Sequence, residues 1–138
     1  AKYDDGRVDY AKVLRNEPLL YLSACIRESQ RIQPAGLLLK RRLQEDALVP
    51  KSTYRDSSGR ALVLRKGRIV FVPMYLMHHD PTEYPNPDKF QPERWLVKNA
   101  QTGKVQLKAP TPGYYYPFGG GPKMCVGFQL AEKQVKMA

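Results

Sequence analysis

Residues 118–127 read FGGGPKMCVG, a glycine-rich loop that carries a single cysteine, Cys125. The helix-forming residues 128–138 follow directly, so we expect Cys125 just before the N-terminus of a helix. At that place the helix dipole and the unpaired N–H groups favour a thiolate, which is the form of cysteine that binds metals. Glycines permit turns closed to other residues and let the backbone lie close to a flat ligand.

Three kinds of chemistry suit such a loop: a thiolate ligand to haem iron, a nucleophilic cysteine, and a phosphate-binding loop. The phosphate loop fails in detail, because Lys123 is followed by Met124 and not by Ser or Thr. A nucleophile needs a base, and the sequence does not define whether His78 or His79 lies near Cys125. A thiolate ligand to haem fits these residues better than the other two.

The amino-terminal part predicts a helix over residues 16–33. Asn16 is a good N-cap, and Pro34 cannot continue a helix. Apolar residues recur at helical spacing: Leu19, Leu22 and Ile26. Glu28 and Arg31 are three residues apart, so they share one face of the last turn.

Residues 35–73 predict a small antiparallel sheet. Short extended stretches alternate there with turn residues: 36–42, 61–64 and 68–72, separated by 56–59 and 66–67. The fold class is therefore mainly α with a small antiparallel β-sheet.

Residues 81–117 predict an irregular meander and loop without a long helix or central strand, because prolines interrupt the first part. These prolines are Pro81, Pro85, Pro87 and Pro92. Within this region we expect residues 98–117 to be loop, with a turn at Gly103.

The 138 residues are 42% hydrophobic and 26% charged, which suits one packed domain and excludes wholesale disorder. The net charge of +10 suits nucleic acid, an anionic membrane or an acidic protein. The longest apolar stretch, residues 19–26, is far too short to span a membrane. No leader sequence is readable, and residues 128–138 contain no helix stop signal, so we expect the chain to be part of a longer protein.

Three motifs occur in the order of one known family. The pattern Phe118-x-x-Gly121-x-x-x-Cys125-x-Gly127 resembles the haem-ligand signature of the cytochrome P450 superfamily, the haem-thiolate monooxygenases. Glu28-Ser29-Gln30-Arg31 resembles the family's Glu-x-x-Arg helix. Residues 90–95, FQPERW, resemble the segment whose arginine, here Arg94, completes a Glu–Arg–Arg triad. The resemblance implies an incomplete, carboxy-terminal part of that fold.

The resemblance also implies a cofactor, haem b (iron protoporphyrin IX). Cys125 would be the metal ligand and Phe118 would pack near it. Gly121 and Gly127 would permit the tight loop and the start of the helix. Lys123 would face a haem propionate, as a point charge without the bidentate fork of an arginine.

By the same resemblance, the complete enzyme inserts one oxygen atom from O2 into a small apolar substrate, with electrons from a reductase. Thiolate ligation favours O–O cleavage. An acidic reductase surface would dock near Lys123, Lys133 and Lys136, and residues 35–38 could border the substrate pocket. Glu28, Arg31 and Arg94 would hold the meander against the helix without touching substrate, so alanine at Glu28 or Arg31 should abolish haem incorporation.

The distal segment that supplies a monooxygenase's catalytic acid and threonine is absent, so no catalytic residue is identifiable. We expect the isolated chain to be inactive, and a truncated or degenerate gene product is an alternative. A basic nucleic-acid-binding or interaction module is a further alternative, but no basic recognition helix or aromatic RNA-binding motif is present, so no nucleic acid is expected. Family resemblance suggests the endoplasmic reticulum membrane, reached through an amino-terminal region that this chain lacks.

Several other residues are expected to have structural and not functional roles. Cys25 is expected to be a buried small hydrophobe, and a disulfide with Cys125 is not expected. The tyrosines 114–116 are expected to fix a half-buried loop. His78 and His79 are expected to be surface or hydrogen-bonded loop residues, because a metal site needs three or four convergent ligands.

Overall fold

A computed structural model describes residues 19–50, 53–54 and 57–137. The chain divides into two compact units. The larger unit comprises Ala1–Leu37 and Met74–Ala138, and the smaller comprises Leu38–Pro73. All three motifs singled out in the sequence lie in the larger unit.

The first helix of the larger unit is α2, Leu20–Ile32. Its N-cap is Leu19, which has φ −125° and makes no side-chain cap, while the cap expected at Asn16 lies outside the described residues. The buried stripe of α2 includes Ala24, Glu28 and Arg31, at spacings of four and three residues. Leu22, expected on the apolar face, is 38% exposed, because a charged pair occupies the buried side of the helix instead.

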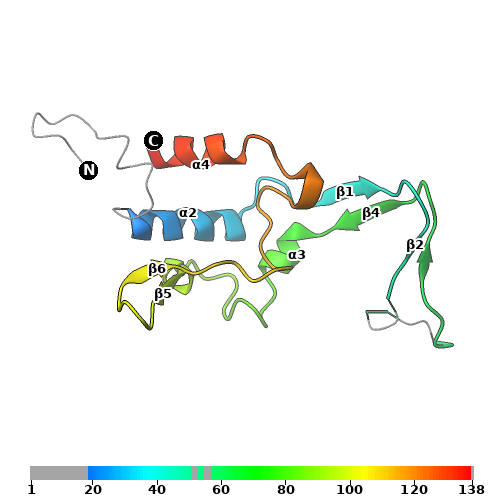
Figure 1. Cartoon of the computed structure of the whole chain (residues 1–138), viewed down its shortest axis with the longest axis horizontal. Coiled ribbons are helices and arrows are strands. Elements are labelled where there is room, and N and C mark those ends of the chain that lie inside the picture. The colour runs from blue at the N-terminus through cyan, green and yellow to red at the C-terminus, as the bar shows by residue number, and fades with distance from the viewer. Residues whose placement is uncertain (1–18, 51–52, 55–56, 138) are drawn as a thin grey trace, which may run out of the picture. The chain divides into compact units, whose positions relative to one another are not determined.

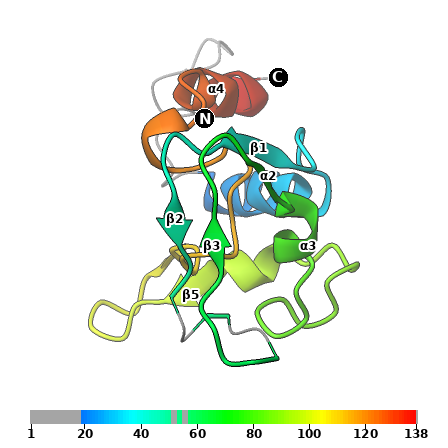
Figure 2. The same cartoon turned by 90° about the vertical axis from the view of Figure 1, so that its right-hand side faces the viewer.

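The smaller unit contains two short antiparallel strand pairs (Figures 1 and 2). Strand β1, Leu39–Arg42, pairs with β4, Ile69–Val72, so that Leu39 lies opposite Val72. Strand β2, Ala47–Leu48, pairs with β3, Val63–Leu64. The region predicted as one small sheet thus forms two separate ladders. Gly67 adopts φ 80° in the turn before β4, a conformation that favours glycine.

The larger unit contains a hairpin that the sequence reading missed. Strand β5, Leu96–Lys98, pairs antiparallel with β6, Val105–Leu107, although residues 98–117 were expected to be loop. The Asn99 side chain accepts hydrogen bonds from two backbone N–H groups in the turn, those of Gln101 and Thr102, at 2.9 and 3.0 Å. The tight turn explains why two short strands can pair here, since Gly103 supplies φ 68° where the expected turn falls.

The remaining elements of the larger unit are short helices and α4. Helix α3, Met74–His78, was not expected from the sequence, and the 3₁₀ turns η1 and η2 span Pro92–Trp95 and Gly121–Lys123. Helix α4, Phe128–Met137, lies alongside α2 (Figures 1 and 2). Unlike α2, helix α4 contains no buried residue.

The core of the larger unit is a small aromatic cluster. Its buried members are Ala24, Tyr84 and Trp95. Leu96, Leu107, Tyr114 and Tyr115 are partly buried and pack against it. The core therefore joins α2, η1, the hairpin and the segment that leads to the cysteine. Helices with small antiparallel sheets are the fold class that the sequence predicted.

Candidate functional site

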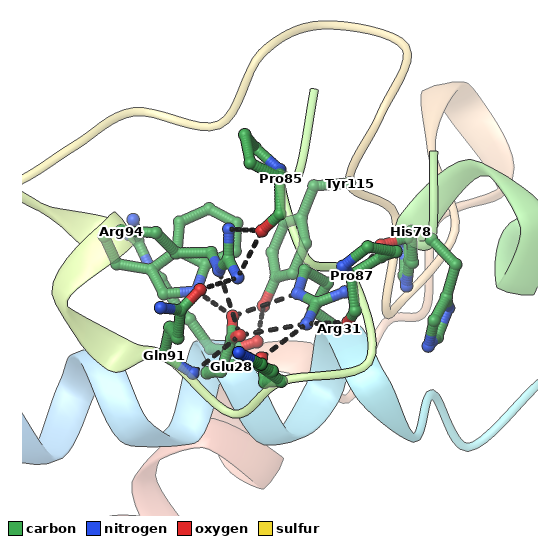
Figure 3. A network of polar contacts seen from close by, with 12 residues as sticks. Glu28, Arg31, His78, Pro85, Pro87, Gln91, Arg94 and Tyr115 are labelled. Carbon is green, nitrogen blue, oxygen red and sulfur yellow. Dashed lines mark hydrogen bonds and ion pairs between the residues drawn. The ribbon is translucent and has the colours of Figure 1, made fainter. Parts of the chain in front are cut away.

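The carboxylate of Glu28 lies at the centre of a polar network (Figure 3). Its Oε1 accepts hydrogen bonds from Arg31 Nη2, the Gln91 N–H and Arg94 Nε, at 2.9, 3.1 and 3.0 Å. Its Oε2 accepts from Arg31 Nε at 3.0 Å and from the indole Nε1 of Trp95 at 2.8 Å. We call these five residues the Glu28 network. The structure thus brings Arg94 to Glu28 and Arg31, which are three residues apart on α2, although Arg94 lies 66 positions beyond Glu28 in the sequence.

Two guanidinium groups face one carboxylate, and both also donate to backbone oxygens. Arg31 donates to the carbonyl oxygens of His78 at 2.8 Å and Pro87 at 2.6 Å. Arg94 donates through Nη1 and Nη2 to the Pro85 oxygen, at 3.3 and 3.2 Å. A guanidinium group has five N–H donors in a fixed plane, so each arginine joins several segments at once. The network therefore fixes the coil between α3 and η1.

Burial by itself would raise the pKa of the Glu28 carboxyl, because it disfavours the charged form. The hydrogen bonds from Arg31, Gln91 and Trp95 outweigh burial and lower the pKa. Glu28 is consequently ionised at neutral pH although it is fully buried. Removing one partner of such a buried pair leaves an uncompensated charge, which costs about 3–5 kcal/mol.

An aromatic chain connects this network to the segment before the cysteine. The Tyr115 ring lies 4.8 Å from the Trp95 ring and 5.4 Å from the His78 ring, measured between centroids. The Tyr115 hydroxyl donates to Gln30 Oε1 on α2 at 2.9 Å. Burial raises the pKa of Tyr115, so its hydroxyl remains protonated and can donate. Tyr114, Tyr115 and Tyr116 are half-buried, as expected.

The cysteine loop, residues 118–127, is held by its own backbone. The Cys125 N–H donates to the Phe118 oxygen at 2.9 Å, which closes the loop. Gly119 and Gly121 adopt φ 74° and 68°, a region that favours glycine. The Cys125 side chain is exposed, three residues before the start of α4. The ring of Phe118 lies 6.3 Å from that of Phe128, the first residue of α4, so the two ends of the loop pack together.

The other loop residues singled out in the sequence have distinct surroundings. Lys123 ends η2 and is exposed. A Cβ atom on Gly127 would lie 3.9 Å from the Cys125 sulfur, an ordinary contact, so sterics do not demand glycine there. A Cβ atom on Gly120 would lie 2.9 Å from two ring atoms of Tyr116, so that glycine is needed for the close approach of the ring.

The histidines and the second cysteine lie elsewhere. His78 is hydrogen-bonded, as one of the two predicted alternatives had it, but it is fully buried and ends α3, so a surface or loop position was wrong for it. Cys25 is only half-buried, and both cysteines are free. Within residues 19–50, 53–54 and 57–137, no three His, Cys, Asp or Glu side chains gather in a way that would hold a metal ion. None of the helices in the same ranges has the length and apolar composition needed to cross a membrane.

The residues of the cysteine loop fit a thiolate-bound planar cofactor. The loop presents one exposed cysteine sulfur three residues before the start of α4, and a cysteine sulfur is a ligand for haem iron. The model of the cytochrome P450 family matches residues 12–138. This chain belongs to the cytochrome P450 family.

Individual relatives have the same family name. Cytochrome P450 9e2 of Blattella germanica is 33% identical over 135 residues, which are 98% of this chain and 22% of that protein. Probable cytochrome P450 28c1 of Drosophila melanogaster is 39% identical over 120 residues, 87% of this chain and 22% of the relative. The chain thus spans about a fifth of the length of these P450 relatives.

A solved structure resembles the chain as well. A zebra fish cytochrome P450, solved with abiraterone, superposes with a TM-score of 0.63 at 29% identity. The superposition covers 87% of this chain and 24% of the zebra fish chain. Sequence and structure therefore agree on the family and on a partial P450 fold.

The sequence analysis did not predict the hydrogen bonds that Trp95, His78 and Tyr115 make. Trp95 was quoted only as the end of a motif, yet its indole N–H binds the buried carboxylate. His78 and Tyr115 connect α2 to the cysteine loop, and they have no local signal because their partners are distant in sequence.

Proposed function

We propose that the full-length protein is a haem-thiolate monooxygenase in which the Cys125 thiolate would hold the iron of haem b. The observation that carries this proposal is the exposed Cys125 sulfur, on a closed glycine-rich loop at the start of α4. Membership of the cytochrome P450 family supports it. When bound, the haem supplies the activation of O2 and the insertion of one oxygen atom into an apolar organic substrate.

Each residue of the loop has a proposed part in holding the cofactor. Phe118 packs at the base of the loop against Phe128, and Gly121 provides the turn with φ 68°. Gly127 directly precedes Phe128, the first residue of α4, and would permit the start of that helix. Lys123 is exposed and offers one positive charge to a propionate, without the two parallel hydrogen bonds of an arginine. A Cys125 thiolate would hold the haem iron and would supply the electron-rich ligation that oxygen-activating haem enzymes of this kind use.

The Glu28 network acts at a distance from the reaction. Glu28, Arg31 and Arg94 hold the coil between α3 and η1 against α2, and Tyr115 connects that assembly to the cysteine loop. We propose that this arrangement keeps the loop in place for haem binding and that these side chains do not touch substrate.

The proposed partners follow from charge and from exposed apolar residues. The chain carries a net charge of +10, and Lys123 and Lys133 are exposed on the cysteine loop and on α4, which suits an acidic reductase surface. Leu37 is 58% exposed, within the segment proposed to border the substrate pocket. Relatives include cytochrome P450 3A31 of Mesocricetus auratus, and we propose that the full-length protein resides at the endoplasmic reticulum membrane.

We further propose that the chain by itself is inactive. It spans about a fifth of its relatives, and the distal acid and threonine expected of a monooxygenase are not recognisable in it. The alternative is a truncated or degenerate gene product. An assay of the full-length protein distinguishes the two, because the proposal requires that protein to bind haem and to oxidise substrate.

The decisive experiment is the carbon monoxide difference spectrum of the reduced full-length protein. We expect the Soret band of a thiolate-ligated haem in the wild type and its loss in Cys125→Ser. The matched control is Cys25→Ser, which changes the other free cysteine, half-buried on α2, and should leave the band unchanged. A thiolate band that persists in Cys125→Ser would refute the proposed ligand.

A further inference from the structure

His78 contacts both the Glu28 network and the segment that enters the cysteine loop (Figure 3). It is fully buried at the end of α3. Its carbonyl oxygen accepts from Arg31 Nη1 at 2.8 Å, and its ring nitrogen Nε2 accepts the Tyr116 N–H, also at 2.8 Å. Its ring stacks on Tyr115, with an interplanar angle of 26°. His78 thus contacts α2 through its backbone oxygen and residues 115–116 through its ring.

Tyr116 in turn determines how the loop begins. Its carbonyl oxygen accepts the Gly119 N–H at 3.0 Å. Its ring occupies the space beside Gly120, where a Cβ atom would come within 2.9 Å of the ring. Phe118, two residues further on, accepts the Cys125 N–H and closes the loop. A shift of the Tyr116 backbone would therefore displace Gly119 and Phe118, which lie at the start of the cysteine loop.

We infer that His78 is a positioning residue for Cys125: its unprotonated Nε2 holds the Tyr116 N–H and thereby fixes the entry to the cysteine loop. The inference rests on the proposed function only in naming Cys125 as the group that is positioned. The histidine touches neither substrate nor the proposed cofactor. It acts through Tyr116.

The inference requires a neutral ring, and the surroundings of His78 provide one. A backbone N–H can only donate, so Nε2 carries no proton and the neutral ring is protonated at Nδ1. Nδ1 is buried and has no hydrogen-bond partner among the residues that the structure describes. Burial lowers the pKa of His78 to about 4, and the positive charges of His79 and Arg31 act in the same direction, while the backbone of Arg31 and Gln30 opposes them.

Charged and titratable groups from several elements surround the His78 ring. Helix α2 contributes Arg31, with its partner Glu28. The segment before the cysteine loop contributes Tyr115, and the residue after His78 contributes the imidazole of His79. Protonation of His78 at Nε2 would place a donor against the Tyr116 N–H, so the hydrogen bond would be lost as the pH falls through about 4.

His79 offers a matched control in the neighbouring position. Its Nδ1 lies 2.9 Å from the Tyr75 oxygen, and its ring stacks on the Tyr75 ring at 4.1 Å. Both contacts are with a residue one turn earlier in the same short segment. A substitution of His79 therefore changes the histidine directly after α3 and leaves the hydrogen bond between His78 and Tyr116 in place.

The test compares His78→Leu, His78→Gln and His79→Leu in the full-length protein. The first readout is amide hydrogen exchange of the peptide containing Tyr116, which does not depend on haem. We expect His78→Leu to accelerate this exchange about tenfold, as loss of one buried hydrogen bond would. His78→Gln places Oε1 near the Nε2 position and should restore most of the protection. His79→Leu should leave it at the wild-type level.

The second readout is the fraction of the reduced carbon monoxide complex that shows the thiolate Soret band. We expect this fraction to fall in His78→Leu and to recover in His78→Gln. In wild type it should fall below pH about 4, whereas in His78→Gln, which has no imidazole to protonate, it should be retained to lower pH. Wild-type exchange and a wild-type band in folded His78→Leu would overturn the inference.

Poor folding of His78→Leu would not end the test. His78→Asn and His78→Gln carry the same amide, but only glutamine is long enough to reach the Nε2 position. Greater protection of Tyr116 in the glutamine variant supports the inference, and equal protection in the two overturns it. Failure of the proposed function is distinguishable, because it shows as a thiolate band that persists in Cys125→Ser while the exchange results stand.

Discussion

The Glu28 network and the cysteine loop belong to the same unit, but their polar groups are satisfied in opposite ways. Glu28 and Arg31 are fully buried, and donors from α2, the meander and η1 surround the carboxylate. The cysteine loop relies on backbone hydrogen bonds and positive-φ glycines, and its sulfur is exposed. The network is thus complete within the chain's own residues, whereas the loop leaves its chemically active atom available to a ligand.

The two helices that carry these regions show the same contrast. Helix α2 buries five residues, including the charged pair, whereas α4 buries none. Both helices are amphipathic in sequence, so composition alone does not separate them. The difference lies in their partners, because η1 and the hairpin cover α2. Helix α2 is therefore enclosed by other elements of its unit, whereas α4 is not.

We expect Glu28→Ala to have the largest effect on stability and on haem content. It leaves the buried guanidinium of Arg31 without its counter-charge, so we expect the free energy of unfolding of the full-length protein to fall by about 3–5 kcal/mol. Haem content after purification should fall close to zero. Denaturant unfolding and the ratio of haem to protein measure the two effects. Glu45→Ala, which changes an exposed carboxylate of the smaller unit, is the control and should alter neither.

The pH dependence of the unfolding free energies of wild type and Glu28→Ala tests whether the charge of the Glu28 carboxylate causes the stabilisation. The pKa of Glu28 is lowered in the folded state, so its contribution to stability is present above its unfolded value and is lost as the pH falls through the folded value. The stability gap between wild type and Glu28→Ala should therefore narrow in acid. A gap that is constant down to the lowest pH would show that the carboxylate charge is not what stabilises the network.

A smaller effect is expected from Trp95→Phe. This change retains an aromatic ring in the core but removes the indole N–H that binds Glu28 Oε2 at 2.8 Å. A hydrogen bond to a charged group contributes about 1.5–3 kcal/mol, and the carboxylate keeps its other donors. Denaturant unfolding should show a loss within that range, with haem content largely retained. A loss as large as that of Glu28→Ala would mean that the ring packing, and not the N–H, is what matters.

The smallest effect is expected from the ion pair of Arg65 with Asp46 in the smaller unit. The two side chains are 72% and 47% exposed, although their nitrogen and oxygen lie 2.7 Å apart. Exposed pairs of this kind are screened by solvent and contribute little. We expect Arg65→Ala to leave the unfolding midpoint unchanged at physiological salt. A shift comparable to that of Trp95→Phe would contradict the view that burial, and not charge pairing itself, gives the Glu28 network its strength.

The sequence reading succeeded where neighbours in the chain decide the outcome. Glu28 and Arg31 lie on one face of α2 because helical geometry places residues three apart side by side, and the ion pair is formed at 2.9 Å. The glycine-rich approach to Cys125 also followed from local rules, since Gly119 and Gly121 adopt positive φ. The turn at Gly103 was expected, but its flanking strands were missed because each is only three residues long.

By itself, the sequence determined the family, the order of the motifs, the pairing of Glu28 with Arg31 and the loop that carries Cys125. Only the tertiary structure decided that the Trp95 indole completes the shell around Glu28 and that His78 holds Tyr116. The reason is physical. These hydrogen bonds join residues 67 and 38 positions apart, and no periodicity or propensity of a local segment specifies which distant donor will reach a buried acceptor.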